Sequence, residues 1–292
     1  MIHENRGQFA DIINMTANRA GFRASLIEKD YYLTLILSKL DNLSDDLIFK
    51  GGTCLNKIYY TYYRLSEDLD FSMRLPEYTT TRGNRRKSIQ PIKDKIDGFA
   101  KTLGLRIEGA EKAGRNESKQ YVYYFIYRSA LQPSEQFIKF EIGLRFNPIC
   151  AVEKRPVQHK FLHPFTKEPL FDGGKVNCLS LNEIVGEKLR AAALREKIAP
   201  RDFYDLDFIL RHSFNLADKE VIGLFKKKIE EDGADPELIK YRVNLGRSDA
   251  EIRDMRSRVE NELFDVLTTD ERKNFDLDKA LERINKAMEG VK

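Results

Sequence analysis

The segment 47–72, LIFKGGTCLNKIYYTYYRLSEDLDFS, constrains the fold more than any other part of the chain. A short apolar run enters a Gly-Gly-Thr turn at 51–53, an amphipathic stretch follows, and the chain continues through Asp-Leu-Asp-Phe at 68–71. Apolar runs bounded by glycines and acidic turn residues are typical of strands, and helical apolar spacing between them indicates a connecting helix. We therefore predict a strand over 47–50, a helix over 53–63 and a strand over 69–73.

Asp68 and Asp70 are two residues apart, so in a strand both side chains project from one face, roughly 7 Å apart at a rise of ~3.3 Å per residue. Two carboxylates at this spacing repel each other unless a cation lies between them. Mg²⁺ or Mn²⁺, held by carboxylates and substrate phosphates, suits such a pair. Gly51, Gly52 and Thr53 would let the backbone approach an anion at the start of the helix. Together these features indicate a site for a nucleoside triphosphate.

The sequence contains its own control, because Asp-Leu-Asp occurs three times, at 68–70, 205–207 and 276–278. With 46 acidic residues in the chain, the bare pattern is close to chance. The second copy lies in a stretch with helical apolar spacing, where its carboxylates diverge, and the third is placed to cap a helix. Only the first follows a Gly-Gly-Thr turn at the distance of one helix. A polar strand end is the alternative for that copy.

The pattern G-G-T-x-L, a helix, and then R-x-S-x-D-L-D-F resembles the AbiEii/AbiGii toxin family of nucleotidyltransferases, in the polymerase-β-like superfamily. Gly52 and Thr53 stand at the family's glycine turn, and Asp68 and Asp70 match its paired metal ligands. The order and spacing of the motifs match to about residue 210. The resemblance implies an α+β fold, with a polymerase-β-like mixed sheet, flanking helices and a C-terminal helical lobe.

A site of this kind needs a third carboxylate from a neighbouring strand. Glu141 is the best candidate, because the apolar residues at 138, 140 and 142 would face the core and leave Lys139 and Glu141 on the open face. In the family this strand carries the third acidic residue, usually Asp, so Glu141 is a mild departure. The alternative is a Lys-Glu pair on a solvated strand face.

Two later segments resemble the family elements E-K-L-x-A-L and R-D-x-Y-D-L. By motif position, Lys188 would neutralise the β- and γ-phosphates, a role suited to a lysine on a rigid helix. Asp205 matches the family's later acidic residue and would orient Lys188 or the nucleotide, and Arg190 is a further candidate for contact with the nucleotide. The alternative for Asp205 is a surface pair with Arg201, four residues earlier on a helix.

The resemblance implies a Mg²⁺-dependent (or Mn²⁺-dependent) enzyme that transfers a nucleoside monophosphate from an NTP to an acceptor hydroxyl. It further implies the toxin of a type IV-like toxin–antitoxin or phage-defence (abortive infection) system, with a tRNA 3′ end among the acceptors and an antitoxin encoded nearby. Two alternatives stay open: a small-molecule, antibiotic-modifying nucleotidyltransferase, and a non-catalytic binding protein of the same fold.

The remaining sequence features limit the domain organisation, the location and the kinds of site that the chain can have. At 292 residues the chain can hold two lobes, which we place at 1–175 (catalytic) and 176–292 (helical). A net charge of +4 does not by itself indicate nucleic-acid binding. Three scattered cysteines, no signal-like start and no long apolar run favour a cytoplasmic protein without membrane contact. Neither a zinc pattern around His159 and His163 nor a P-loop is present.

Three local features carry predictions of their own. Ser25 with Glu28, and Ser180 with Glu183, have the spacing of helix-capping boxes.

Residues 77–88 are predicted to form a loop that contains most of the densest basic run. This run is either a solvated loop or a contact for an RNA backbone. Tyrosines near residue 60 could stack on bases, or lie partly in the core. The basic run comprises Arg74, Arg82, Arg85, Arg86 and Lys87, and the tyrosines are Tyr59, Tyr60, Tyr62 and Tyr63.

Overall fold

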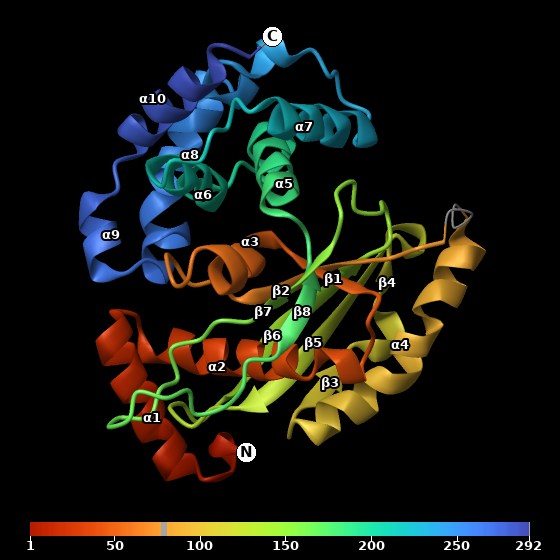
Figure 1. Ribbon diagram of the computed structural model, residues 1–292, viewed down its shortest axis with the longest axis vertical. Helices are drawn as coiled ribbons and strands as arrows, with labels where there is room; N and C mark the ends of the chain where they lie inside the picture. Colours follow the sequence, from red (N-terminus) through yellow and green to blue (C-terminus); the bar gives the residue numbers. More distant parts are fainter. Residues whose placement is uncertain (77–80, 292) are drawn as a thin grey trace. The chain divides into compact units, whose positions relative to one another are not determined.

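The computed structural model describes residues 1–76 and 81–291. The chain forms two compact units, Met1–Leu179 and Ser180–Lys292 (Figure 1), and each is described by itself. The predicted boundary at 175/176 cuts the strand β8 (Lys175–Cys178) after its first residue. In the structure β8 is hydrogen-bonded between two strands of the first unit, β1 and β7, so the first unit ends after it.

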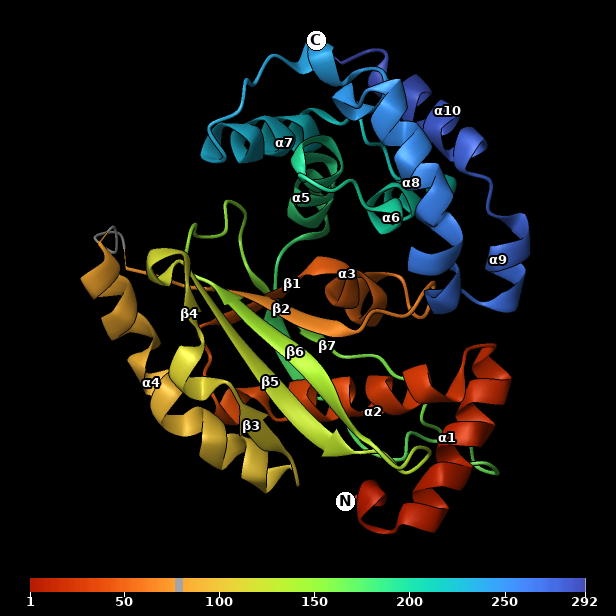
Figure 2. The same ribbon diagram turned by 180° about the vertical axis from the view of Figure 1, so that it is seen from behind.

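Unit 1 is built on one eight-stranded sheet with the strand order β3-β5-β6-β2-β1-β8-β7, and β4 pairs with β5 (Figures 1 and 2). The pairs β1–β8 and β2–β6 are parallel and the remaining pairs are antiparallel, so the predicted mixed sheet is confirmed. The strands are β1 Leu47–Lys50, β2 Asp68–Met73, β3 Arg106–Glu108, β4 Gly114–Arg115, β5 Gln120–Arg128, β6 Glu135–Gly143, β7 Glu153–Pro156 and β8 Lys175–Cys178.

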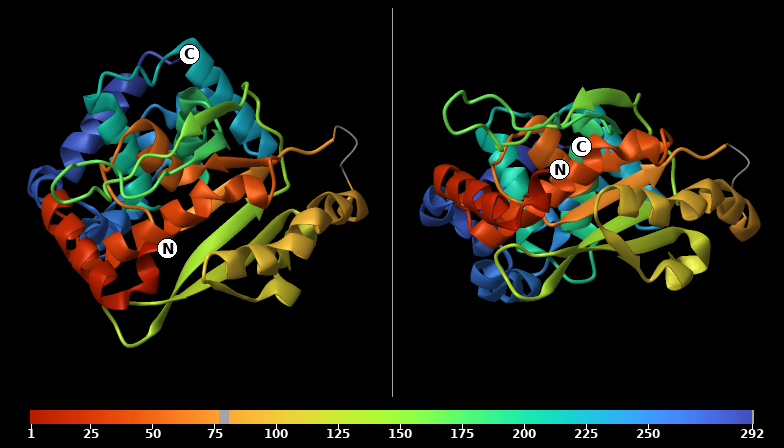
Figure 3. Two further views of the ribbon diagram at one scale, coloured as in Figure 1. Left: turned by 60° about the horizontal axis from the view of Figure 1, so that its bottom comes forward. Right: turned by 90° about the horizontal axis from the view of Figure 1, so that it is seen from below.

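One face of the sheet is an aromatic core. Phenylalanine rings from four adjacent strands meet with centroid distances of 5.4, 4.7 and 5.3 Å, in the order Phe49, Phe71, Phe140 and Phe125. Helices α2 (Ala24–Ser38) and α4 (Arg82–Thr102) cover this face, and α1 (Arg6–Ala20) packs against α2. Figure 3 shows α4 as the gold helix beside the yellow-green strands. The alternate residues of β2 and β6 therefore lie on the opposite face of the sheet.

Helix starts in unit 1 differ from the predictions. Helix α4 begins at Arg82, because the Thr81 hydroxyl accepts a hydrogen bond from the Asn84 amide (3.2 Å), so the predicted loop is wrong from residue 82 onward. The first part of that predicted loop, residues 77–80, lies outside the described residues. Helix α2 begins at Ala24 and Ser25 does not cap it. Glu28 instead accepts hydrogen bonds from the Ser129 hydroxyl and the Ala130 amide, both at 2.6 Å.

The helix after β1 is shorter than predicted. It consists of α3 (Gly51–Cys54), continued by a π-helical turn (Leu55–Tyr59). The turn is anchored to α2 by a fully buried ion pair between Lys57 Nζ and Asp30 Oδ1 (2.6 Å). π-Helical turns occur often at functional sites, where they shift the register of a helix. Here the turn follows the Gly-Gly-Thr segment directly.

Unit 2 is helical throughout the residues that the structure describes, as predicted for the C-terminal part. Ser180 caps its first helix through the Glu183 amide (3.2 Å), and Asp276 caps its last through the Asp278 amide (2.9 Å). A break after α7 contains Gly233 in the left-handed region, at φ +72°. The α-helices are α5 Leu181–Leu194, α6 Pro200–Arg211, α7 Lys219–Glu231, α8 Asp249–Glu262, α9 Thr269–Asn274 and α10 Leu277–Met288.

Candidate active site

The three predicted carboxylates lie on two adjacent strands. In the parallel pair β2–β6, Asp68 is opposite Lys139 and Asp70 is opposite Glu141. Because paired residues share a face, Asp68, Asp70 and Glu141 all project from the face opposite the aromatic core. All three are half-buried. The structure therefore brings Glu141 onto the same face as Asp68 and Asp70, which precede it by more than 70 positions in the sequence.

The carboxylates repel one another electrostatically. Burial, together with the negative charges of Glu141 and Asp68, raises the pKa of the Asp70 carboxyl to about 6. Lys50, opposite Asp70 on β1, and Lys139 act in the other direction. Burial lowers the pKa of Lys139, but its hydrogen bond to Glu141 and the charges of all three carboxylates raise it, and the net shift is upward. The geometry favours an additional cation at this face.

Glu141 has contacts with two neighbours. Lys139 Nζ lies 2.6 Å from Glu141 Oε2, and Gln120 Nε2 donates to Glu141 Oε1 at 2.6 Å. The Lys139 and Glu141 side chains are only 33% and 24% exposed, so the pair is not a fully solvated one. Among the described residues, no group of three or more His, Cys, Asp or Glu side chains is arranged to hold a metal ion. Gln120 was missed by the sequence reasoning, because its approach to Glu141 depends on the β5–β6 register.

The glycine turn packs directly against β2. Gly51 has φ +77°, and a Cβ at this position would lie 2.7 Å from Asp70 Oδ2. A Cβ on Gly52 would lie 2.6 Å from Arg64 Nη2. The Thr53 hydroxyl donates to the backbone carbonyl of Asp68 at 2.5 Å. Small residues at 51 and 52 and the hydroxyl at 53 thus fix the start of α3 beside the two aspartates.

In unit 2, Lys188 lies in a cluster of acidic side chains. Its Nζ is 2.7 Å from Asp205 Oδ2 and 3.0 Å from Asp202 Oδ1. The Asp202 and Asp205 side chains are 3% and 0% exposed. The sequence reasoning linked Asp205 to Lys188 but missed Asp202, which lies in the same R-D-x-Y-D-L motif. Position 202 is one helical turn before 205, and that spacing was the available signal.

Two arginines considered in the sequence have other partners. Arg201 Nε donates to the backbone carbonyl of Glu262 at 2.6 Å, whereas Asp205, its predicted alternative partner, lies against Lys188. Arg190 Nη1 lies 3.2 Å from Asp232 Oδ2 at the end of α7. The structure therefore groups Lys188 with Asp205, and links Arg190 to a different part of unit 2.

The basic run divides into two kinds of residue. Arg82, Arg86 and Lys87 are exposed on α4. Arg85 is buried, and its Nη2 donates to the backbone carbonyl of Glu117 at 3.0 Å. Only the exposed members have the accessibility that a phosphate contact needs.

The tyrosines near residue 60 and the histidine at 159, which the sequence also offered as candidates, have contacts typical of packing. Tyr62 and Tyr63 are buried, and the Tyr59 hydroxyl donates to the Leu179 carbonyl at 2.6 Å. The His159 ring stacks on Phe171 with a centroid distance of 4.4 Å. These contacts fit packing roles. No helix among the described residues is both long enough and apolar enough to cross a membrane.

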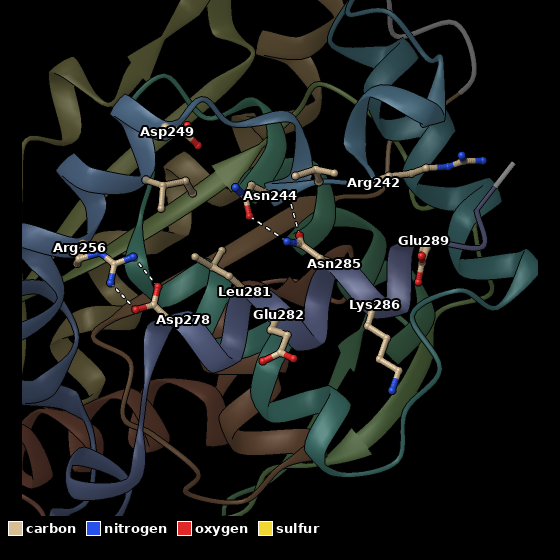
Figure 4. Close-up of a pocket in the computed structure, with 12 residues that line it drawn as sticks. Arg242, Asn244, Asp249, Arg256, Asp278, Leu281, Glu282, Asn285, Lys286 and Glu289 are labelled. Carbon is tan, nitrogen blue, oxygen red and sulfur yellow. Dashed lines mark hydrogen bonds and ion pairs between the residues drawn. The ribbon is translucent and has the colours of Figure 1, made fainter.

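A pocket of about 730 Å³ opens in unit 2 between α8, α10 and the segment 242–244 (Figure 4). Its lining includes an ion pair between Arg256 and Asp278 (2.5 Å). It also includes a hydrogen bond from the backbone N–H of Asn244 to Oδ1 of Asn285 (2.7 Å). None of the predicted site residues lines it.

The chain is similar to known nucleotidyltransferase toxins. A family model described as nucleotidyl transferase AbiEii toxin, type IV toxin–antitoxin system, matches residues 35–289. The structure of MenT4, a nucleotidyltransferase toxin from Mycobacterium tuberculosis, is 18% identical with a TM-score of 0.60, covering 96% of this chain and 99% of that one. A Helicobacter pylori protein described as a candidate nucleotidyltransferase is also 18% identical, with a TM-score of 0.54, covering 92% of this chain and 95% of that one.

A comparison with curated proteins finds no significant match. The two structural likenesses establish the α+β fold with its mixed sheet, and the family model covers most of the chain. The chain therefore belongs to the AbiEii family of nucleotidyltransferase toxins of type IV toxin–antitoxin systems.

Proposed function

We propose that this toxin transfers a nucleoside monophosphate from an NTP to an acceptor hydroxyl, and that Asp68, Asp70 and Glu141 form the catalytic centre. The observation that carries this assignment is the β2–β6 register, which sets Asp70 opposite Glu141 with Asp68 on the same face. Three acidic side chains on one sheet face, beside a glycine turn, repel one another even with Lys139 and Lys50 nearby, and this favours a further positively charged ligand.

By donor chemistry the set fits a hard divalent cation, and binding would require the three side chains to rearrange, because among the described residues no group of three is arranged to hold a metal ion as it stands. All three groups are carboxylates, which Mg²⁺ and Mn²⁺ prefer. The pKa of Asp70 is raised by burial and by the negative charges of Glu141 and Asp68, and a bound cation would offset both. Asp68, Asp70 and Glu141 would hold the ion. When bound, it would supply positive charge to the reacting α-phosphate and polarise it.

The other residues have roles that follow from the family motifs. Gly51, Gly52 and Thr53 would approach the triphosphate through the backbone at the start of α3. Lys188 would carry positive charge to the phosphates that leave. Its contact with Asp205 at 2.7 Å supports a positioning role for this aspartate. Arg190 is the weakest candidate, because its guanidinium already pairs with Asp232.

The reaction proposed forms a bond between the acceptor oxygen and the α-phosphorus, and breaks the bond from that phosphorus to the bridging oxygen of the β-phosphate. Pyrophosphate leaves, and the hydroxyl proton passes to solvent. Protein side chains in such reactions mainly position the reactants and stabilise charge. We place the 3′ end of RNA, with tRNA among the candidates, as the acceptor, and a neighbouring gene product as the antitoxin.

Isotope transfer tests the proposal. The purified protein is incubated with each NTP, labelled either at the α- or at the γ-phosphate, with Mg²⁺ and total RNA. Label from the α-position should appear in RNA and label from the γ-position should not. Asp70→Asn protein that remains folded should transfer none. Transfer to an aminoglycoside in place of RNA would favour small-molecule modification, and full activity of Asp70→Asn would refute the assigned centre.

A further inference from the structure

The side chain of Lys139 occupies a distinctive place on the open face of the sheet. It projects from β6 on the face that carries the three carboxylates: its backbone position is opposite Asp68, and its Nζ lies 2.6 Å from Glu141 Oε2. Strand geometry places it on the same face as Glu141, because the two residues are two positions apart. The only lysine within β6 is therefore directed at the third carboxylate of the candidate centre.

Both oxygens of Glu141 are engaged. The Lys139 ammonium pairs with Oε2, and Gln120 Nε2 donates to Oε1 at 2.6 Å. Gln120 is itself oriented by Asn116, whose Nδ2 donates to Gln120 Oε1 at 3.1 Å. Glu141 is thus held in place by a row of polar side chains, whereas the Asp70 carboxylate lies against the glycine turn.

We propose that Lys139 is a resident counter-cation of the carboxylate centre: its ammonium group neutralises Glu141, and it must leave Glu141 before that carboxylate can bind a divalent ion. The inference rests on the proposed metal-dependent function and adds a specific competitor to it. An ammonium group in contact with a carboxylate repels any second cation that approaches the same oxygens. Asp68 and Asp70 would then take up the first ion, and Glu141 would join after Lys139 has turned away.

If the ion pair between Lys139 and Glu141 had only a structural role, its removal should have a different effect on metal binding. Partly exposed ion pairs contribute little to stability, so their removal changes folding slightly and leaves ion affinity unaffected. A counter-cation, by contrast, opposes metal binding. The affinity for a divalent ion therefore distinguishes the two roles without any measurement of catalysis.

The experiment measures binding of Mn²⁺ to the whole protein without nucleotide, by electron paramagnetic resonance of the free ion. Lys139→Met should bind Mn²⁺ about fivefold more tightly than wild type, or better, which corresponds to removing ~1 kcal/mol of charge repulsion. Lys139→Arg, which keeps the charge, should bind like wild type. Lys93→Met, on the exposed face of α4, removes the same charge elsewhere and should also bind like wild type.

A double-mutant comparison locates the effect at Glu141. In a Glu141→Gln background, Lys139→Met should no longer tighten binding. Equal tightening with and without Glu141 would overturn the proposal, because the effect would then be a general one. An unchanged affinity of Lys139→Met would also overturn it while leaving the proposed function intact, provided that Asp70→Asn abolishes binding. Absence of Mn²⁺ binding in wild type and Lys139→Met alike would overturn both.

Discussion

Among single residues, Asp70 connects stability with metal binding most directly. Its carboxyl has a pKa of about 6 in the folded protein, above the ordinary value of 3.8. The folded state therefore binds this proton more tightly than the unfolded state, and the stability that this provides is lost as the pH rises from about 4 to about 6. Above that range, without a metal ion, the ionised Asp70 destabilises the fold.

We expect Asp70→Asn to be more stable than wild type at pH 8 in the presence of a chelator, by ~1–3 kcal/mol. The difference should shrink toward pH 4, where the wild-type carboxyl is protonated in the folded state. Urea unfolding at both pH values measures this. Asp11→Asn removes one carboxyl from the exposed face of α1, outside the carboxylate site, and is the control. A less stable Asp70→Asn at pH 8 would contradict the assigned repulsion.

Gly51 is the second residue with a sharp expectation. Its φ of +77° is a conformation that residues with a Cβ adopt at a cost, and the added Cβ would lie 2.7 Å from Asp70 Oδ2. Gly51→Ala should lower the free energy of unfolding by at least ~1–2 kcal/mol. Gly98→Ala in α4, where a Cβ meets no atom within 4 Å, should instead raise it by up to ~1 kcal/mol. Thermal denaturation of both variants is the measurement, and equal effects would argue against a constrained turn.

At the scale of elements, the packing of α5 on α6 depends on Lys188. Removing its ammonium group leaves Asp205 and Asp202 buried with less compensating charge. Lys188→Ala should therefore destabilise unit 2 by ~3–5 kcal/mol. Lys197→Ala is the matched control, because Lys197 pairs with Glu262 at 3.0 Å on the surface and its loss should cost less than ~1 kcal/mol.

The measurement is denaturant unfolding of the full chain, followed by far-ultraviolet circular dichroism. Adding Asp205→Asn to Lys188→Ala should recover part of the lost stability, since it removes a buried charge that has lost its contact with Lys188. A small effect of Lys188→Ala would mean that the cluster is hydrated. The effect on NTP use is then best judged with Lys188→Arg, which keeps the charge but not the compact shape of an ammonium group.

Elements also show which parts of the structure the sequence could predict. The strands β1 and β2 and the face of β6 that carries Glu141 follow from apolar runs and alternation, and these predictions held. The start of α4 was missed because its first turns are polar, so apolar spacing gave no signal before Ile89. The capping box at Ser25 was wrong because Glu28 has tertiary partners in Ser129 and Ala130.

The candidate site divides in the same way. Motif spacing predicted Asp68, Asp70 and Glu141 as candidate site residues, because each lies in a local pattern, and the β2–β6 register places them on one face. Gln120 was missed because its contact with Glu141 depends on strand register. Asp202 was missed although its spacing from Asp205 was a local signal, and its contact with Lys188 depends on how two helices pack. Local patterns name the residues of a site, whereas their partners are determined by tertiary structure.

At the scale of the whole molecule, charge is nearly balanced, with 50 basic and 46 acidic residues. Overall attraction to RNA is therefore weak, and binding must depend on local clusters. The exposed residues Arg82, Arg86 and Lys87 on α4 are such a cluster. Arg85 is left out of the variant described next, because its guanidinium is buried against the Glu117 carbonyl and its removal would disturb the fold.

If these three side chains contact RNA phosphates, replacing all of them with Ala should weaken RNA binding and flatten its salt dependence. Each lost contact with single-stranded RNA lowers the slope of log K against log salt by ~0.7, so the triple variant should lose up to ~2. A control variant with Ala at Lys219, Lys226 and Lys227 removes the same charge from the exposed face of α7. Filter binding across a salt series compares the two. Equal changes in both variants would show that the α4 cluster acts only through net charge, while a change confined to the α4 variant would place the RNA backbone at this helix.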